Sequence, residues 1–114
     1  MVLIIGGAYQ GKTEAALEIA GEEPDRVMNR VHEWIRGRMD AGAGQDEIRE
    51  ELFGIAECRK DMIFVADEIG CGIVPVDVFE RKYRETAGRI LCDLAKQADE
   101  VYRVMAGIPG KIKG

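Results

Sequence analysis

The sequence Gly6-Gly7-Ala8-Tyr9-Gln10-Gly11-Lys12-Thr13 decides the fold of this chain. It fits the pattern G-x-x-x-x-G-K-[ST], a loop whose backbone N–H groups converge on a phosphate. Val2–Ile5 precede it as a short apolar run typical of a buried parallel strand. Residues 14–20 follow it and are rich in helix formers. Strand, glycine-rich loop and helix together predict a phosphate-binding loop; the alternative is an ordinary glycine-rich turn between a strand and a helix.

Each position of this loop has an expected role. The backbone N–H groups of the loop, together with the positive end of the following helix, are predicted to cradle the phosphates of a nucleotide. Lys12 is expected to reach the β- and γ-phosphates as a catalytic point charge, and the Thr13 hydroxyl to ligate Mg²⁺. ATP or GTP with Mg²⁺ are therefore the expected cofactors. Tyr9 either stacks on a base or points outward. The predicted nucleotide-binding residues are Gly6, Gly7, Ala8, Tyr9, Gln10, Gly11, Lys12 and Thr13.

Composition limits the class of protein. A hydrophobic content of 46% in 114 residues indicates a folded chain, which we expect to form one domain over residues 1–114. A net charge of −5 argues against a nucleic-acid partner, because phosphate backbones require a basic surface. No apolar run approaches the roughly 18 residues of a membrane span, and no basic segment of a signal peptide precedes the first strand. The three cysteines include no C-x-x-C pair, which favours the cytoplasm and gives no zinc signature.

Strand and helix patterns alternate along the rest of the chain. Helical spacing of apolar residues predicts helices over 31–39, from about residue 45, and over 77–97, with a break at 41–44. Apolar runs predict strands at 62–66 and 100–105, a short strand near 26–29, and a terminal strand in the tail from 107. This order predicts an α/β fold: a P-loop NTPase-like, doubly wound, mostly parallel sheet with helices on both faces.

Two carboxylates follow the apolar strand at 62–66. Asp67 and Glu68 come at its carboxyl end, the edge of an open α/β sheet where ligands bind. We expect Glu68 to be a catalytic or magnesium-side carboxylate, sharing the metal with Thr13. The alternative is a carboxylate that caps the neighbouring loop.

The second half of the chain resembles one family closely. The resemblance rests on the segments at 67–75 (Asp-Glu-Ile-Gly-Cys-Gly-Ile-Val-Pro), 83–89, 98–102 and 106–113, which recur in that order and spacing. The chain is similar to the adenosylcobinamide kinase/adenosylcobinamide-phosphate guanylyltransferase family of cobalamin biosynthesis. The resemblance implies a P-loop domain assembled as a trimer. It also implies phosphorylation of adenosylcobinamide by a nucleoside triphosphate, followed by transfer of GMP through a guanylylated histidine.

Three departures from the family pattern bear on function. The family's guanylylated histidine lies in a segment between its second strand and its Walker-B-like strand. This chain is too short to contain that segment, and His32 does not match the position of the family histidine. We interpret His32 as a structural histidine, either packed or facing solvent. Asn29 stands where the family has a carboxylate that helps to hold the metal, and Asp67 replaces an Asn beside Glu68. Arg84 and Arg89 either contact phosphate across a subunit boundary or have an ordinary solvated or ion-paired role.

The sequence therefore supports a leading hypothesis and two alternatives. The leading hypothesis is a shortened relative of this family that transfers a phosphoryl group to adenosylcobinamide and has lost guanylyl transfer. The first alternative is a catalytically inactive nucleotide-binding sensor or assembly subunit. The second is a small kinase or NTPase that acts on an unrelated substrate.

Overall fold

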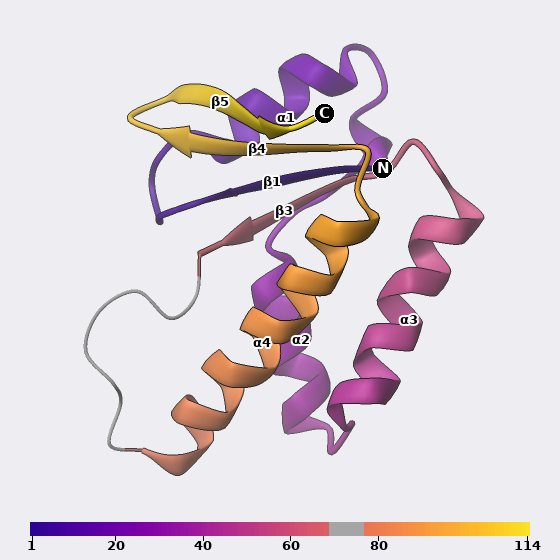
Figure 1. The fold of residues 1–114 in the computed structure, drawn as a ribbon, viewed down its shortest axis with the longest axis vertical. Helices are drawn as coiled ribbons and strands as arrows, with labels where there is room; N and C mark the ends of the chain where they lie inside the picture. Colours follow the sequence, from indigo (N-terminus) through magenta and orange to yellow (C-terminus); the bar gives the residue numbers. More distant parts are fainter. Residues whose placement is uncertain (69–76) are drawn as a thin grey trace.

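A computed structural model describes residues 1–68 and 77–114. Within these residues the chain forms one sheet of five strands in the order β2-β3-β1-β4-β5. The strands are β1 (Val2–Gly6), β2 (Val27–Met28), β3 (Ile63–Asp67), β4 (Glu100–Met105) and β5 (Ile108–Lys113). Figure 1 shows β1 running between β3 and β4.

The sheet is parallel except at one edge. β1 pairs in parallel with β3 and with β4, and β2 pairs in parallel with β3. β5 is the terminal strand predicted in the tail, and it pairs antiparallel with β4. Because the first four strands run in one direction, the loops that follow β1, β2 and β3 leave from the same edge of the sheet. The predicted mostly parallel α/β sheet is confirmed.

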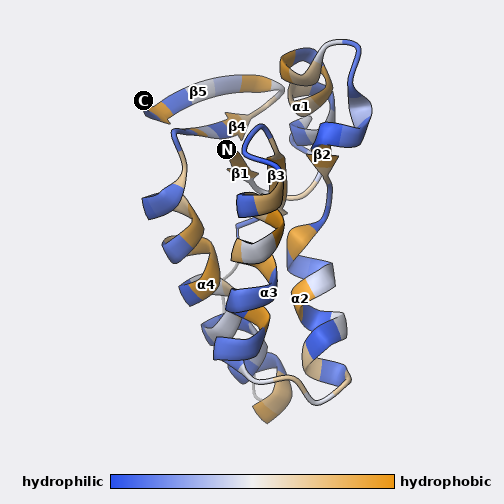
Figure 2. Ribbon diagram, turned by 90° about the vertical axis from the view of Figure 1, so that its right-hand side faces the viewer, coloured by the Kyte–Doolittle hydropathy of each residue, from blue (hydrophilic) through white to orange (hydrophobic). Residues whose placement is uncertain are grey.

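Helices cover both faces of the sheet, as predicted. On one face lies α1 (Lys12–Ala20), whose small residues Ala15, Ala16 and Ala20 pack against Ile4 and Val65. On the other face lie α2 (Val31–Asp40), α3 (Gln45–Cys58) and α4 (Val78–Gln97), as Figure 1 shows. Hydrophilic and hydrophobic residues alternate along these three helices in Figure 2, the pattern of a helix with one buried side. Their larger core contains Leu3, Ile35, Leu52, Phe64 and Ile90.

The helix ends follow the sequence signals. Gly21 ends α1 with a φ of 65°, a left-handed value that glycine adopts without strain. Asp77 caps α4, and its side chain accepts a hydrogen bond from the backbone N–H of Glu80. The loop residues Gly70, Cys71, Gly72 and Pro75 lie outside the described residues. None of the described helices has the length and apolar character needed to cross a membrane.

Candidate functional site

A cavity of about 550 Å³ opens at the carboxyl edge of the parallel strands. Its walls come from the loop between β1 and α1, from the segment that links β2 to α2, and from the end of β3. The topology produces this arrangement, because adjacent parallel strands release their loops side by side. The side chains that matter below are Lys12, Thr13, Asn29, His32 and Asp67, all of which line the cavity.

The loop before α1 contains two residues with a left-handed backbone. Gly11 precedes the helix with a φ of 86°, and Tyr9 is left-handed at a φ of 60°. The N-cap residue of α1 is Gly11, which offers no side-chain acceptor to the first backbone N–H groups of the helix. Free N–H groups at a helix N-terminus attract anions. The structure thus places the N-terminus of α1 at the cavity, and phosphate binding by the loop remains a prediction.

Lys12 is buried beneath this loop. Its residue is only 8% exposed, and its ammonium donates a hydrogen bond of 2.6 Å to the carbonyl oxygen of Gly7. The same ammonium lies 2.8 Å from Oδ1 of Asp67. Buried ammonium groups are costly unless they are paired, so Asp67 stabilises Lys12 inside the site. These contacts hold the charge of Lys12 at the loop.

Asp67 also contacts His32 from two sides. The backbone N–H of Asp67 donates to Nδ1 of His32 over 3.0 Å, and Oδ2 of Asp67 lies 3.4 Å from Nε2 of His32. Because Nδ1 accepts a hydrogen bond, the ring is assigned as neutral with its proton on Nε2. Burial lowers the pKa of His32, and it outweighs the nearby Asp67 carboxylate, which raises it. The ring is thus a neutral group that fixes both the backbone and the carboxylate of Asp67.

Helix α4 supports this histidine from behind. The hydroxyl of Tyr83 donates a hydrogen bond of 3.0 Å to the backbone carbonyl of His32. Tyr83 is buried, and the guanidinium of Arg36 lies 5.1 Å from the centre of its ring. Burial raises the pKa of the Tyr83 hydroxyl, which therefore stays protonated and able to donate. The position of His32 is set by the packing of α2 against α4.

Thr13 faces Asn29 across the cavity. The side-chain amide of Asn29 donates to Oγ1 of Thr13 over 3.2 Å, and its carbonyl accepts from the backbone N–H of Arg30 over 3.0 Å. Both residues are exposed to the cavity, so the Thr13 hydroxyl remains accessible. The structure therefore brings Asn29, noted in the sequence as the replacement of a carboxylate, into direct contact with the predicted metal ligand.

Glu68 pairs with a residue outside the cavity lining. Its carboxylate is 3.0 Å from the guanidinium of Arg103 on β4, and its backbone N–H donates to the carbonyl of Gly6 over 2.8 Å. Glu68 is not among the residues that line the cavity. The metal and catalytic roles of Glu68 remain predictions, and the carboxylate that the structure places at Lys12 belongs to Asp67.

Sequence reasoning located the loop but not all of its partners. The sequence predicts a structural role for His32, and the side chain is packed, with 12% of it exposed. The same side chain also lines the cavity. Its place in the sequence could have revealed this, because His32 follows the predicted short strand near 26–29 and therefore lies at the same carboxyl edge of the sheet as Asp67. Arg103, the partner of Glu68, belongs to no motif identified in the sequence. Arg89 pairs with Glu85 at 2.5 Å, in agreement with the alternative of an ordinary ion pair.

The fold and the site together define an α/β protein of P-loop type. The model of the cobinamide kinase / cobinamide phosphate guanyltransferase family matches residues 25–112. This range includes Asn29, His32 and Asp67 and begins after the loop at residues 6–13. The chain belongs to this family.

Two relatives carry the same name, bifunctional adenosylcobalamin biosynthesis protein CobU. The protein of Salmonella typhimurium (strain LT2) is 38% identical over 85 residues, which is 75% of this chain and 46% of the relative. The protein of Escherichia coli (strain K12) is 39% identical over 67 residues, which is 59% of this chain and 37% of the relative. The alignments therefore cover less than half the length of each relative.

Proposed function

We propose that this protein binds a nucleoside triphosphate in the loop at residues 6–13 and transfers its terminal phosphoryl group to an alcohol. The acceptor proposed from the family is the aminopropanol hydroxyl of adenosylcobinamide, within cobalamin biosynthesis. The observation that carries this proposal is the buried Lys12, held by Gly7 and Asp67 at the start of α1. Phosphoryl transfer depends mainly on positioning and charge stabilisation, which such a lysine supplies.

The pairing of Lys12 with Asp67 indicates how a phosphate would enter. A phosphate oxygen is an anionic partner of the same kind as Oδ1 of Asp67, which lies 2.8 Å from the Lys12 ammonium. A triphosphate would therefore compete with Asp67 for Lys12, while the free N–H groups at the start of α1 bind the remaining oxygens. Residue Arg30 also lines the cavity and adds positive charge at its wall.

The donors in the cavity fit a magnesium ion. Magnesium prefers oxygen ligands, in general one or two carboxylates or hydroxyls together with phosphate oxygens and water. The Thr13 hydroxyl and the Asp67 carboxylate both line the cavity and provide such oxygens. We propose that these two residues hold Mg²⁺ when the nucleotide is bound, and that the metal neutralises charge on the phosphates. Glu68 is a further candidate only if it leaves Arg103.

Guanylyl transfer is proposed to be absent. It requires a histidine nucleophile with a free ring nitrogen. In His32, Nδ1 accepts from the backbone of Asp67 and Nε2 faces the carboxylate of the same residue. We therefore expect that GTP labelled at the α-phosphate leaves no acid-labile covalent label on the protein. Appearance of such a label would contradict this part of the proposal.

The second candidate function is a nucleotide-binding subunit without catalysis. It is favoured by Asn29, which contacts Thr13 with an uncharged amide where the family has a carboxylate. Binding of triphosphate without turnover, in the presence of cobinamide, would select it. A kinase for an unrelated acceptor would instead show turnover with other alcohols in a substrate panel.

The test is a calorimetric titration of ATP and GTP with Mg²⁺, combined with phosphate release measured with and without cobinamide. The variant is Lys12→Met, which removes the charge but retains most of the buried volume of the side chain. Lys60→Ala is the matched control, because Lys60 is exposed in the turn between α3 and β3. We expect binding and cobinamide-dependent release in the wild type and in Lys60→Ala, and loss of both in Lys12→Met. Absence of binding in the wild type would overturn the proposal.

Location and assembly complete the proposal. We propose a cytoplasmic protein, in keeping with Cys58 and Cys92, which are exposed free thiols. A homo-oligomer, specifically a trimer, is proposed from the family alone. Sedimentation equilibrium would test it.

A further inference from the structure

The turn between β4 and β5 has an unusual backbone. Met105 pairs with Ile108, so Ala106 and Gly107 form a hairpin turn of two residues. Both are left-handed, with φ values of 49° and 77°. Two left-handed residues are the mark of a type I′ turn, which matches the twist of a hairpin. Alanine is rare at such a position because its Cβ is crowded there, so a contact outside the hairpin must stabilise this turn.

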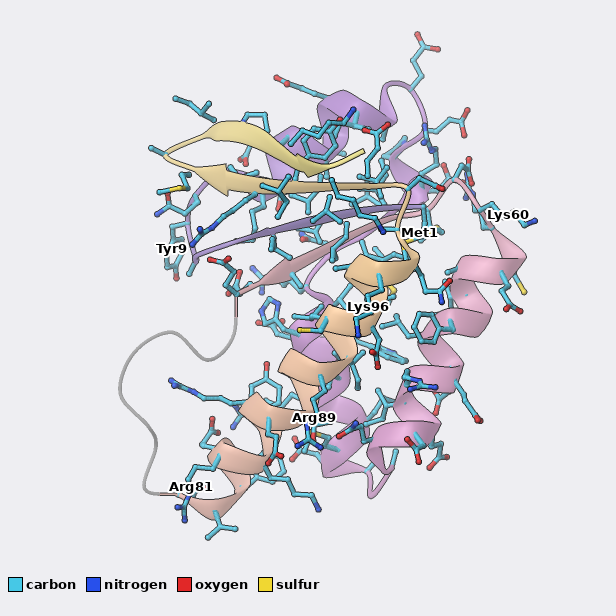
Figure 3. The ribbon with its side chains drawn as sticks, viewed as in Figure 1. Met1, Tyr9, Lys60, Arg81, Arg89 and Lys96 are labelled. Carbon is cyan, nitrogen blue, oxygen red and sulfur yellow. The ribbon has the colours of Figure 1, made fainter. Side chains whose placement is uncertain are left out.

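That contact is Gln10, in the middle of the loop before α1. The backbone N–H of Ala106 donates to Oε1 of Gln10 over 2.5 Å. The backbone N–H of Gly107 donates to the carbonyl oxygen of Gln10 over 2.8 Å. In a two-residue hairpin these two N–H groups have no partner within the ladder, so Gln10 satisfies both. Figure 3 shows Tyr9, the neighbour of Gln10, at the end of the sheet opposite Met1, where Figure 1 shows the β4–β5 turn.

Close packing reinforces these hydrogen bonds. A Cβ atom placed on Gly11 would lie 3.2 Å from the Cα of Gly107, a distance tighter than most real contacts. The turn therefore touches the phosphate loop at Gln10 and at Gly11. By contrast, all six residues of β5 are exposed, so the strand adds no side chain to the core. The β4–β5 turn is thus the part of the hairpin that reaches the carboxyl edge of the parallel strands, where the cavity lies.

The contact also determines the direction of the next amide. In a planar trans peptide the C=O and the following N–H point in opposite directions. The carbonyl of Gln10 points toward the turn, on the β4 side of β1. The N–H of Gly11 therefore points away from the turn, and Gly11 lines the cavity.

We propose that Gln10 is a positioning residue and that the β4–β5 turn orients the Gly11 N–H for a phosphate oxygen. The inference rests on the proposed function, because it concerns the same triphosphate. It adds the C-terminal hairpin to the site. Without the Gln10 side chain, the turn would be held only by the hydrogen bond from the Gly107 N–H to the backbone carbonyl of residue 10. The Gln10–Gly11 peptide would then be less restricted, and the Gly11 N–H would be less firmly oriented before the ligand arrives.

The test compares Gln10→Ala with the wild type and with Gln97→Ala, a matched control at the exposed end of α4. Binding of inorganic triphosphate and of MgATP is measured by calorimetry, and amide hydrogen exchange at Ala106, Gly107 and Gly11 by NMR. We expect triphosphate affinity to fall roughly tenfold in Gln10→Ala, the equivalent of one well-placed hydrogen bond. Exchange at Ala106 and Gly107 should accelerate in the free protein. Gln97→Ala should change neither quantity.

The outcomes separate this inference from the proposed function. Failure of the wild type to bind triphosphate would overturn the proposed function, while protection of the Ala106 amide in the wild type would still report the contact. Binding by Gln10→Ala equal to that of the wild type would overturn the inference and leave the proposed function intact. Should Gln10→Ala fail to fold, Gln10→Asn shortens the side chain by one methylene and is expected to give the same faster exchange and weaker binding. Unchanged binding in Gln10→Asn with faster exchange would likewise overturn the inference.

Discussion

Oδ1 of Asp67 lies 2.8 Å from the Nζ atom of Lys12. Asp67 ends β3 and Lys12 begins α1, so the contact joins the carboxyl end of β3 to the helix that follows the neighbouring strand β1. Lys12 is buried and its other acceptor is a single carbonyl oxygen, which makes Asp67 its only charged partner among the described residues. The same ammonium is the group proposed to bind phosphate. Asp67 thus stabilises the buried ammonium of Lys12, and under the proposed function it competes with the phosphate for that ammonium.

Asp67→Asn is expected to destabilise the free protein and to strengthen binding of triphosphate. The amide keeps an oxygen for Lys12 but removes the negative charge, and its NH₂ group would face the Nε2–H of His32. We expect a loss of about 1–3 kcal/mol in the free energy of unfolding, typical of a buried charged group that loses a partner. Affinity for inorganic triphosphate without Mg²⁺ should rise several-fold. Urea denaturation and calorimetry measure the two effects.

Asp93→Asn is the matched control for this change. Asp93 lies 3.5 Å from Arg49, and its side chain is 30% exposed against 32% for Asp67. Surface ion pairs contribute little, so we expect a change within about 0.5 kcal/mol and unchanged triphosphate binding. Equal stability of Asp67→Asn and the wild type, or weaker triphosphate binding, would contradict the role given to Asp67.

His32 should make the stability of the protein depend on pH. Burial lowers its pKa in the folded state, and Lys12 and Arg30 add to this effect, while Asp67 and Glu33 oppose it. The unfolded chain therefore binds a proton more readily than the folded protein. Stability is fully present above the ordinary histidine value of 6.5 and is lost as the pH falls from there through the lowered folded pKa. The slope cannot exceed about 1.4 kcal/mol per pH unit for one proton.

The measurement is urea denaturation of the wild type and of His32→Gln between about pH 8 and about pH 5. Gln retains an acceptor for the Asp67 backbone N–H but does not titrate in this range, so the difference between the two curves isolates His32. The wild type should lose stability relative to His32→Gln below pH 6.5. Parallel curves would show that His32 has the same pKa in both states.

The elements of this fold were predictable because the signals are local. The helix beginning at Val31 and the strand ending at Asp67 follow from apolar spacing within a few residues. The partners of the site were not predictable in the same way. Asp67 and His32 are separated by 35 positions, and their contact depends on the order β2-β3-β1, which apolar spacing does not specify. The contact of Gln10 with Ala106 spans 96 positions and has no sequence signature.

Gly6 and Gly7 are predicted to differ in tolerance of a side chain, and the loop pattern G-x-x-x-x-G-K-[ST] likewise requires glycine at Gly6 but accepts any residue at Gly7. A Cβ on Gly6 would lie 2.6 Å from the backbone oxygen of Val104, so β4 would have to move. Gly6→Ala should cost about 1–3 kcal/mol, as overpacking does. A Cβ on Gly7 would meet only the Cγ of Gln10 at 3.7 Å, an ordinary contact, so Gly7→Ala should change stability by less than about 1 kcal/mol. Thermal denaturation of both variants tests the difference, and equal losses would contradict it.

Asn29→Asp is expected to strengthen the dependence of nucleotide binding on Mg²⁺. In the wild type the Asn29 amide donates to Oγ1 of Thr13 and so occupies a lone pair of the hydroxyl that is proposed to ligate the metal. A carboxylate would accept the Thr13 proton instead, which frees the hydroxyl oxygen and adds a negative charge beside it. It would also retain the hydrogen bond from the backbone N–H of Arg30. Calorimetric titration of ATP at several Mg²⁺ concentrations should show a gain of several-fold in affinity at saturating Mg²⁺ and a loss without Mg²⁺, because the added charge then repels the phosphates.

Asn29→Ala, which frees the hydroxyl without adding charge, is the control. It should show no loss of affinity without Mg²⁺ and only part of the gain at saturating Mg²⁺. A gain of the same size in Asn29→Ala would assign the effect to the released hydroxyl alone. If the ATP affinity of Asn29→Asp did not depend on the Mg²⁺ concentration, the metal would bind away from Thr13.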